Sequence, residues 1–485
     1  MSIEIVFPVG LWDELNRHLL RAPKDGSDHL VDEQMAFVIA GINRSDSRIR
    51  ILAHEIHTAK PEHLFRQSPA AIAPRMEYVA SMLARCRRDG WSLIEVHSHP
   101  FASGRGTTFS SIDWRNDRRT MPPTSGFLPD VAMYASMVIG QESLDAHVYE
   151  RSTNSIVPVT NIYVLGRGAN NRAITSIPTT SGFNGNYHAG SVEERHQRQE
   201  LLFGGEGQRM LSRAAIAVVG LGGLGSFVAL ELAYLGIGRL VLIDPDCVEK
   251  SNLNRLMGAK STDIGRKKVE VYRDLIGAIA PGTQIAAVDS SIASEEALNY
   301  AKDCDLLMGC VDNHGARLIL NHLAIRYLLP LIDAGTGIRL SGVKRSFAMG
   351  GQVHVVIPGT GCLECRGFID ASKAAFELAP PDIRGYEREH GYGTQQVAPS
   401  VVFLNGVVAS LQVAEIAYLL NLSELIPVIP LNIYDAIKRN VIAVSIKDYK
   451  ACPTCGVDGV QGVGDLAPIH VPIASAGKPP PSIAR

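Results

Sequence analysis

The sequence lacks any surplus of basic residues. It has 47 Lys and Arg against 49 Asp and Glu, a formal net charge of −2 over 485 residues. This balance gives no reason to expect nucleic acid or an anionic membrane as the main partner. The first residues, MSIEIVFPVGLWDE, have neither the basic flank nor the apolar core of a signal peptide. The richest apolar runs, 216–243 and 401–420, are interrupted by polar residues, unlike a membrane span. We therefore expect a cytoplasmic protein.

Cysteine is scarce and unevenly placed. Of eight cysteines, four form two C-x-x-C pairs, GCLEC and ACPTC. In a long chain without a signal peptide, this pattern favours a metal site over disulfides. Two such pairs can complete a tetrahedral thiolate site that keeps no position open. We predict structural zinc at these four residues, with a redox dithiol as the alternative: Cys362, Cys365, Cys452 and Cys455.

The length suggests two or three domains. Residues 1–168 alternate helical and strand-like segments and predict an α/β domain with a central mixed sheet, including a helix over 69–90. Residues 169–190 are rich in Ser, Thr, Asn and Gly and predict a linker. From 191 to 460, strands alternate with helices in a βαβ pattern, which predicts a mostly parallel sheet. Residues 461–485 are expected to be disordered.

Two histidines stand at the end of an apolar run in IEVHSHP. Residues i and i+2 of a strand face the same side, so His97 and His99 can present two imidazoles to one metal ion. Downstream, SSIDWRND offers Asp113 as a third ligand, with Ser110 three residues before it. Zinc with two His, one carboxylate and a water is a common catalytic arrangement. Taken alone, however, SSID also fits a helix N-cap box, and H-x-H need not bind metal.

H-x-H-P followed by S-x-x-D resembles the JAMM motif of MPN-type metallo-isopeptidases. The resemblance implies an MPN-like domain with catalytic zinc on His97, His99 and Asp113. It also implies that Ser110 stabilises the tetrahedral intermediate. A glutamate before a strand that ends in Gly should act as general acid and base, and VDEQMAFVIAG makes Glu33 that residue. The nine residues between Pro100 and Ser110 form a longer loop than is usual in the family.

A glycine-rich loop lies between a predicted strand and helix in IAVVGLGGLGSFVALELAYLG. Glycines there allow a phosphate to approach the backbone, and the helix N-terminus supplies amide donors. The next strand ends at Asp244, where a carboxylate can accept hydrogen bonds from a ribose. This pattern predicts nucleotide binding but does not separate NAD from ATP. The four glycines are Gly220, Gly222, Gly223 and Gly225.

The segments RHQRQELLFGGEGQ, DPDCVEKSNLNR, IGRKKVE and GCVDNHGAR follow in an order that resembles the ThiF/MoeB/HesA family of ubiquitin-activating-type adenylyltransferases. The resemblance covers about residues 195–456 and implies a Rossmann-like doubly wound α/β domain that uses ATP and Mg²⁺. It also implies a homodimer in which Arg198 enters the partner subunit's nucleotide site. The remaining roles carried over are ribose binding by Asp244, phosphate contacts by Asn252, Arg255 and Lys268, Mg²⁺ binding by Asp312, and support by Arg317.

Many members of that family transfer the adenylate to a cysteine on a loop between the two C-x-x-C pairs. Here residues 366–451 contain no cysteine, and Thr394 lies near the place where it would be expected. A threonine hydroxyl stays protonated near pH 7 and is a poor substitute. We therefore predict adenylation without a thioester on that loop. Cys310 ends a buried strand, where a core role is commoner than a functional thiol.

Together the two resemblances imply a fusion of a zinc metallo-isopeptidase with an enzyme that activates a ubiquitin-like protein. One half would cleave an amide bond after the tail of a small β-grasp protein, and the other would adenylate that tail. A conjugating enzyme is a further possible partner. Two alternatives stay open: activation and processing of a sulfur carrier for cofactor or cysteine synthesis, and a nucleotide-binding scaffold with an inactive peptidase site. An NAD-dependent oxidoreductase is disfavoured by NLNR and DNHGAR.

Overall fold

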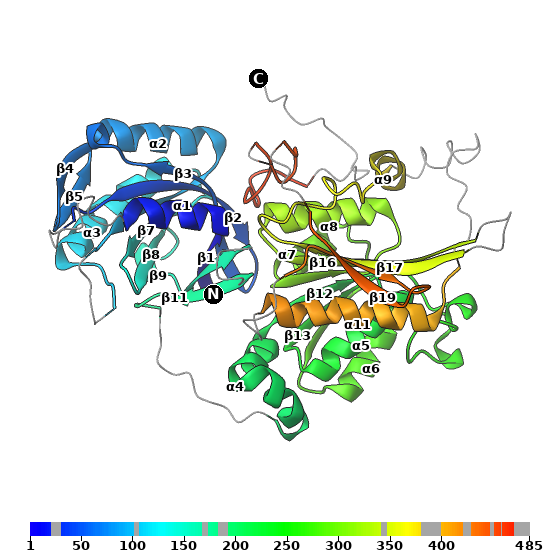
Figure 1. The fold of residues 1–485 in the computed structure, drawn as a ribbon. Helices are drawn as coiled ribbons and strands as arrows, with labels where there is room; N and C mark the ends of the chain where they lie inside the picture. The colour runs from blue at the N-terminus through cyan, green and yellow to red at the C-terminus, as the bar shows by residue number, and fades with distance from the viewer. Residues whose placement is uncertain are drawn as a thin grey trace.

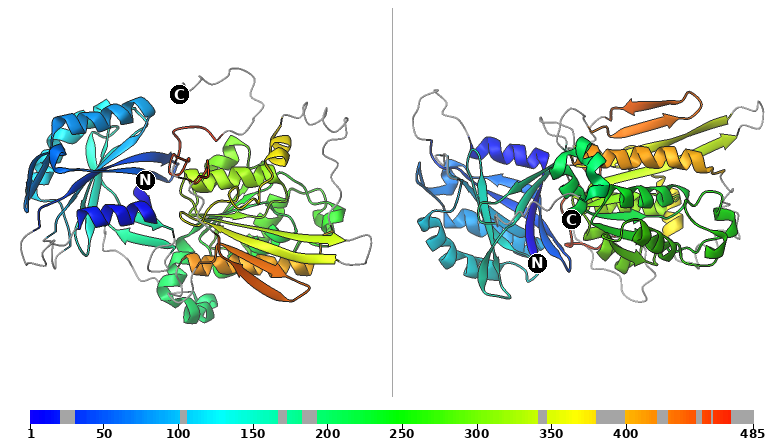
Figure 2. Two further views of the ribbon diagram at one scale, coloured as in Figure 1. Left: turned by 45° about the horizontal axis from the view of Figure 1, so that its top comes forward. Right: turned by 90° about the horizontal axis from the view of Figure 1, so that it is seen from below.

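Two sheets organise the molecule (Figure 1). The computed structural model describes residues 1–20, 31–100, 106–166, 173–182, 193–340, 347–379, 399–420, 428–446, 451–456 and 458–469. Within these residues the first domain is built on a nine-stranded sheet and the second on an eight-stranded sheet. Further views show the two sheets as separate bodies that meet along one side (Figure 2).

The first domain has a mixed sheet in the order β11-β10-β1-β3-β2-β6-β7-β8-β9. β1 runs parallel to both β10 and β3, and β6 runs parallel to β7, whereas the remaining pairs are antiparallel. The mixed sheet that the sequence predicted is therefore present. Its strands are β1 (Ser2–Pro8), β2 (Met35–Arg44), β3 (Arg48–Thr58), β6 (Ser92–Ser98), β7 (Tyr134–Ile139), β8 (Leu144–Glu150), β9 (Ser155–Pro158), β10 (Asn161–Leu165) and β11 (Ile174–Pro178).

Helices cover both faces of this sheet. Successive side chains of a strand alternate between faces, and β2 is apolar on both. Val38 packs in a core with helix α1 (Val9–Leu19), while Phe37 packs on the opposite face with α2 (Met76–Asp89) and α3 (Ser111–Phe127). Burial on both faces explains why β2 reads as a continuous apolar run. It also fixes α3 on the same side of the sheet as α2.

Two expectations for the first domain need correction. The helix expected over 69–90 begins only at Met76, because Ala71–Pro74 forms strand β5, which pairs with β4 (Leu64–Ser68). A residue before proline favours extended backbone, which explains the strand at this point. The expected linker at 169–190 contains β11, which pairs antiparallel with β10 and therefore belongs to the first sheet.

The second domain is doubly wound, as the sequence predicted. Five parallel strands lie in the order β14-β13-β12-β15-β16, and β17, β18 and β19 extend the sheet antiparallel. The strands are β12 (Ala215–Val219), β13 (Arg239–Ile243), β14 (Gln284–Val288), β15 (Leu306–Gly309), β16 (Leu331–Leu340), β17 (Phe347–Val356), β18 (Leu431–Asp435) and β19 (Asn440–Val444).

Helices cover both faces of this sheet too (Figure 1). α5 (Gly223–Leu235), α6 (Lys268–Ile279) and α11 (Val402–Leu419) pack in one core, and α7 (Glu295–Lys302) and α8 (His314–Arg326) pack in the other. α4 (Gln197–Arg213) precedes the sheet and α9 (Ala371–Leu378) contacts α8. Short 3₁₀ turns lie at Pro61–His63, Glu194–His196, Lys250–Asn252 and Ser261–Asp263.

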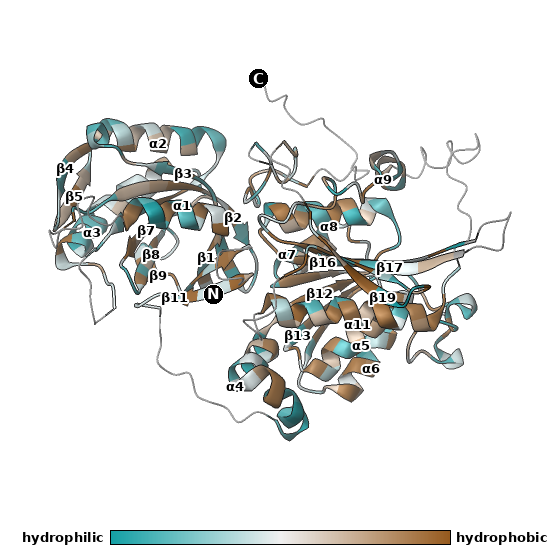
Figure 3. Ribbon diagram, in the orientation of Figure 1, coloured by the Kyte–Doolittle hydropathy of each residue, from teal (hydrophilic) through white to brown (hydrophobic). Residues whose placement is uncertain are grey.

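α11 is the most apolar long helix, and it is brown along much of its length in Figure 3. By length and composition it is the one helix, among the described residues, that could cross a membrane. Half of it is buried, and it packs against α5, β16 and β17. These contacts are those of a helix that covers a sheet.

The two domains are joined by a cluster of charges that are buried or half-buried. On β3, Arg48 and Arg50 each place a guanidinium nitrogen 2.6 Å from the Asp305 carboxylate, just before β15. Arg50 also donates to Glu4 at 3.0 Å and to the Cys304 carbonyl at 2.8 Å. Burial disfavours the charged form of Asp305, but the two arginines outweigh it and lower its pKa. Arginines of the first domain therefore form ion pairs with an aspartate of the second domain.

A C-terminal segment, residues 458–469, forms a strap between the domains (Figure 1). The Asp465 amide donates to Ile42 O on β2, and its carboxylate accepts from Lys302 and Tyr327 of the second domain. Gly41 lies under the strap, where an added Cβ would stand 2.2 Å from Gly462 O. Residues 461–469, expected in a disordered tail, are therefore packed, whereas 470–485 lie outside the described residues.

Candidate active sites

The two histidines of IEVHSHP meet Asp113 at the end of β6. His97 Nε2 lies 3.7 Å from Asp113 Oδ1, and His99 Nε2 lies 3.4 Å from Asp113 Oδ2. One donor atom from each residue fits within 4.8 Å of the others. Zinc bonds of about 2.0–2.2 Å in a tetrahedron place neighbouring donors about 3.3–3.6 Å apart. The three side chains therefore fit a zinc ion without rearrangement of the backbone.

Glu33 lies beside the same cluster, two residues before β2 begins at Met35. Its Oε1 lies 4.0 Å from His99 Nε2, and burial raises the pKa of its carboxyl against the opposing effect of the histidines. The position is fixed because Ser98 and Gln34 are bonded twice: Ser98 N donates to Gln34 O, and Gln34 N donates to Ser98 Oγ. His97 Nε2 is buried and has no hydrogen-bond partner among the described atoms. A buried nitrogen without a partner is costly unless a ligand satisfies it.

Ser110 and Asp113 form the N-cap box that their sequence allowed, and the Asp113 carboxylate also faces the two histidines. Ser110 caps α3, its hydroxyl accepting from Asp113 N at 3.2 Å, while Asp113 Oδ2 accepts from Ser110 N at 2.7 Å. The capping box holds the carboxylate toward the histidines. Burial disfavours the Asp113 carboxylate, but His97 and His99 outweigh this effect and lower its pKa. The cap and the candidate metal ligand are thus one structure.

A second pair fixes the rotation of α3. Asp117, one turn beyond Asp113, lies 2.7 Å from Nε2 of His147 on β8. The His147 ring stacks on the Trp114 ring with 4.7 Å between the ring centroids, and its centroid lies 4.1 Å from that of the Phe109 ring. These contacts anchor the helix after the long loop, of which residues 101–105 lie outside the described residues.

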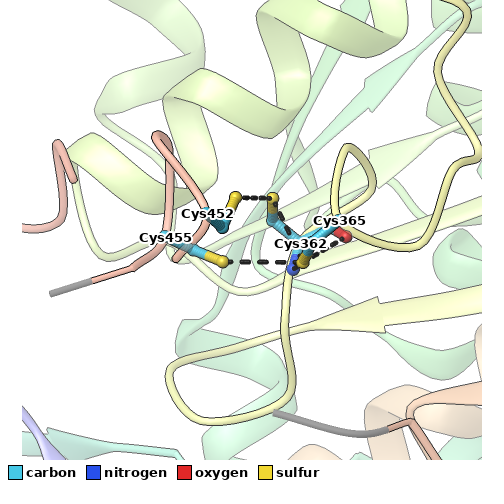
Figure 4. A group of neighbouring side chains, drawn as sticks. All are labelled: Cys362, Cys365, Cys452 and Cys455. Atoms are coloured by element: carbon cyan, nitrogen blue, oxygen red, sulfur yellow. Dashed lines mark hydrogen bonds between the residues drawn. The ribbon is translucent and has the colours of Figure 1, made fainter. Parts of the chain in front are cut away.

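The four cysteines of the C-x-x-C pairs converge (Figure 4). Sulfur atoms lie 3.7 Å apart for Cys362 and Cys452, 3.7 Å for Cys365 and Cys455, and 3.8 Å for Cys362 and Cys365. A disulfide would require about 2.05 Å. Zn–S bonds of about 2.3 Å in a tetrahedron give sulfur separations of about 3.8 Å. The donor set fits a structural zinc ion that joins the chain segments after β17 and β19.

The glycine loop joins β12 to α5 at the carboxyl edge of the parallel strands. A Cβ on Gly225 would stand 1.8 Å from Gly220 O, and one on Gly220 would stand 2.7 Å from Cys310 O. These two glycines are therefore required by close packing of strand and helix. Gly222 meets nothing within 4 Å and leaves the loop open to a ligand. It directly precedes the α5 N-terminus, where backbone amides favour phosphate.

Three acidic or basic residues surround this loop. Asp244 follows β13 and accepts from the Leu221 amide at 2.6 Å, which ties it to the loop. Lys268, the first residue of α6, places Nζ 3.4 Å from Asp244 and 2.8 Å from Asp246. Burial raises the pKa of Asp244 and Lys268 opposes the shift. Asp312 follows β15 and is exposed. Because β13, β12 and β15 are neighbours, all three groups share one edge, at the point where the strand order reverses.

The other residues expected to bind the nucleotide lie in three places: near the glycine loop, inside the domain and on α4. Arg255 lies beside the loop, its Cδ 3.2 Å from a Cβ built on Gly223, and Asn252 accepts from Glu249 N at the turn before it. Arg317 points inward: it pairs with buried Asp333 at 3.1 Å and donates to Val311 O, which holds the loop that carries Asp312. It therefore acts on that loop from inside the domain. Arg198 is exposed on α4, which projects from the second domain (Figure 1).

A family model described as "ThiF family" matches residues 196–456, over half of the chain. The chain belongs to the ThiF family. The match begins after β11, so the first domain lies outside it. The glycine loop, the acidic and basic residues at the carboxyl edge and the four cysteines all lie within the ThiF-family domain.

Relatives named for an enzymatic activity match a similar share of the chain. The sulfur carrier protein ThiS adenylyltransferase of Escherichia coli is 30% identical over 266 residues, 54% of this chain and 94% of that protein. The SAMP-activating enzyme E1 of Haloferax volcanii is 26% identical over 277 residues, 56% of this chain and 92% of that protein. Among solved structures, E. coli MccB with MccA-N7isoASN has a TM-score of 0.45 at 20% identity, and covers 55% of this chain and 76% of that one.

Sequence reasoning missed Asn405 in the ThiF-family domain. This buried α11 residue places Nδ2 2.3 Å from a Cβ built on Gly223, and its Oδ1 accepts from Thr336 at 3.0 Å. An amide in the apolar run 401–420 was the available signal. Cys310 is close to Gln412 within the core, and burial strongly raises the pKa of its thiol, which disfavours a reactive thiolate. Thr394 lies outside the described residues.

Proposed function

We propose that the ThiF-family domain adenylates the C-terminal carboxylate of a ubiquitin-like or sulfur-carrier protein. The observation that carries this proposal is the gathering of an open glycine loop, Asp244, Lys268 and Asp312 at one edge of the parallel sheet. The activities for which the E. coli and H. volcanii relatives are named support the same reaction. The carboxylate attacks the α-phosphate of ATP and pyrophosphate leaves.

Positioning and charge neutralisation account for most of such a reaction. The loop amides at Gly222 hold phosphate oxygens, and the Asp244 carboxylate accepts from the ribose. Lys268 and Arg255 neutralise the phosphates, with Asn252 beside them. Asp312 is the residue that would hold Mg²⁺, which lowers the charge repulsion at the α-phosphate when bound.

A homodimer would supply Arg198 to the partner subunit's site. Two exposed leucines on the same helix, Leu201 at 89% and Leu202 at 72% exposure, support association of α4 with a second copy. A groove lined by Phe227 of α5 and by Phe403 and Val407 of α11 adds apolar surface on this domain. The absence of cysteine from 366–451 supports release or onward transfer of the adenylate without a thioester on that segment.

We propose that the first domain is a JAMM/MPN-type zinc peptidase that cleaves an amide or isopeptide bond after the tail of a ubiquitin-like protein. His97, His99 and Asp113 would hold zinc, which activates water when bound. Buried Glu33 takes the proton from the attacking water and gives it to the leaving amine. The Ser110 hydroxyl stabilises the oxyanion. The fit of the three donor atoms to zinc spacing supports this assignment.

The proposed biology is conjugation and deconjugation of a ubiquitin-like protein in the bacterial cytoplasm, with a conjugating enzyme as a further partner. Sulfur-carrier activation is the second candidate, and the identity to ThiS adenylyltransferase favours it. A scaffold with an inactive peptidase site is the third. Transfer of sulfur to the activated tail, measured with a sulfurtransferase, separates the second from the first.

ATP–pyrophosphate exchange in the presence of candidate ubiquitin-like proteins tests the adenylation. Exchange should depend on the protein's free C-terminus and fall at least tenfold in Lys268→Met, with Lys267→Met as the matched control, because Lys267 pairs with Asp289 on the surface. Binding of ATP without exchange for any candidate would overturn the assignment.

Zinc content tests the first domain. The purified chain should hold about two zinc ions, and His97→Ala should lose one, whereas His54→Ala, a β3 histidine outside the cluster, should lose none. Cleavage of an extended ubiquitin-like precursor should disappear in Glu33→Gln with zinc retained. Zinc at the site without cleavage of any precursor would support the scaffold.

A further inference from the structure

Helix α3 carries a concentration of positive charge directly beyond the candidate metal ligand. Arg115, Arg118 and Arg119 are all exposed and stand at i, i+3 and i+4, so they share one face. With Ser111 and Trp114 they line a shallow hollow of about 580 Å³. We call these five residues the α3 arginine face.

The acidic residues of α3 do not neutralise this face. Asp113 turns toward His97 and His99, and Asp117 toward His147. In the described part of the chain, Arg115 and Arg119 have no ion pair or hydrogen bond, and Arg118 lies over the Trp114 ring at 5.8 Å. The helix therefore presents unneutralised positive charge to solvent, although the whole chain has a net charge of −2.

This arrangement is unfavourable for the helix itself. Like charges at i and i+3 or i and i+4 repel each other. Among the described residues, only the placement of Arg118 over the Trp114 ring offsets part of this cost. A charged surface with so little intramolecular compensation is the kind that a charged ligand stabilises.

We propose that the α3 arginine face binds an acidic segment of the polypeptide whose amide bond is presented to the His97–His99–Asp113 cluster. The inference rests on the proposed peptidase function and specifies its substrate. From Asp113 to Arg119 the helix rises about 9 Å, and at about 100° per residue the three arginines lie on the side of α3 away from Asp113. A segment that reaches both must also pass around the helix, whose radius is about 5 Å, and about six extended residues cover this path. Guanidinium groups bind carboxylates in a bidentate manner, and Trp114 gives the segment an apolar base.

Binding is measured by fluorescence polarisation with defined probes. The zinc-loaded full chain is titrated against a fluorescein-labelled decapeptide of alternating glutamate and glycine, and against the same peptide with glutamine. The glutamate peptide should bind at least about tenfold more tightly at low ionic strength, and the difference should shrink as salt screens exposed charges. Arg115→Glu/Arg118→Glu/Arg119→Glu should lose that preference.

The matched control places the same charge change elsewhere. Arg17, Arg66 and Arg87 are exposed in the first domain, and no ion pair or side-chain hydrogen bond involves them among the described residues. The triple Glu variant at these positions should keep the preference within about twofold. Circular dichroism of both variants shows that the fold is retained, and Arg→Gln at the three α3 positions gives the milder test.

Three results would overturn the proposal. One is equal binding of the glutamate and glutamine peptides, another is retention of the preference by the α3 variant, and the third is tighter binding of a single-stranded decanucleotide than of the glutamate peptide. Failure of the peptidase function gives a different pattern, because polarisation does not require turnover. In that case the preference persists, also in His97→Ala, while no extended precursor is cleaved.

Discussion

Arg50→Ala should weaken the whole molecule, although the residue lies far from both candidate sites in the sequence. The Arg50 side chain is 7% exposed and Glu4, its partner at 3.0 Å, is 8% exposed. Removing one member of a buried pair costs about 3–5 kcal/mol when the other charge is left without compensation, and here Glu4 keeps only Arg48, at 4.0 Å. Asp305 is more exposed and keeps its ion pair with Arg48 at 2.6 Å, so the loss of its pair with Arg50 costs less. We expect Arg50→Ala to lower the free energy of unfolding by about 3 kcal/mol, which lowers the unfolding midpoint by about 6–12 °C for domains of this size.

The chain offers a separate probe for each domain. All three tryptophans, Trp12, Trp91 and Trp114, lie in the first domain, so their fluorescence reports on it. In the His97→Ala background, which removes the zinc proposed for the first domain, release of the zinc expected at the four cysteines, followed with a chelating dye, reports on the second. Because Arg50 contacts Cys304 and Asp305 across the boundary, both transitions should shift to lower temperature.

Arg17→Ala is the control, since Arg17 is an exposed α1 residue without a described side-chain partner. It should change the midpoint by less than about 2 °C, the usual range for a surface substitution. Two results for Arg50→Ala would refute the reasoning that this arginine stabilises the contact between domains. One is a loss of less than about 1 kcal/mol in the free energy of unfolding, and the other is a lower midpoint in the tryptophan signal alone.

Three further predictions concern glycines and pH. Gly225→Ala should prevent folding of the second domain, since its Cβ would stand 1.8 Å from a carbonyl oxygen, whereas Gly222→Ala should fold normally and lose ATP affinity by isothermal titration. Gly41→Ala should displace the strap and raise hydrogen exchange in residues 458–469, and unchanged exchange would contradict the packing argument. Asp303 and Asp305 have lowered pKa values, because hydrogen bonds and arginines outweigh burial. Their stabilisation is therefore present above pH about 4 and lost as pH falls further, which acid titration of the unfolding midpoint measures.

Local patterns predicted the second domain well. The apolar strands, the glycine loop and the acidic residues at strand ends occur in a fixed order, and each is visible within about 30 residues of sequence. A parallel βαβ unit imposes the rest of the geometry. The convergence of the distant cysteine pairs was predictable for a different reason, since thiolates in this spacing share one preferred chemistry.

Long-range contacts were not predictable in the same way. Nothing in the Ser-, Thr- and Asn-rich stretch shows that Ile174–Pro178 pairs with β10, because this pairing depends on a strand completed earlier in the chain. The strap looks polar and Gly-rich in sequence, yet Gly462 and Gly464 donate to carbonyls of α8. At Ser110 and Asp113 the sequence left the cap and the metal ligand as alternatives, and only the geometry shows that the carboxylate of the cap also faces the two histidines.

The strap has a consequence for how this polypeptide could be divided. The surface that receives the first domain is made by Asp303 and Asp305 together with residues 458–469, which follow the last cysteine pair. A cut between residues 182 and 193 leaves every one of these contacts in place, so the two fragments should remain associated. A stop codon after residue 456 removes the strap while it leaves both candidate sites in the chain. We therefore expect the covalent connection between the halves to be dispensable for their association, and loss of the strap to weaken it.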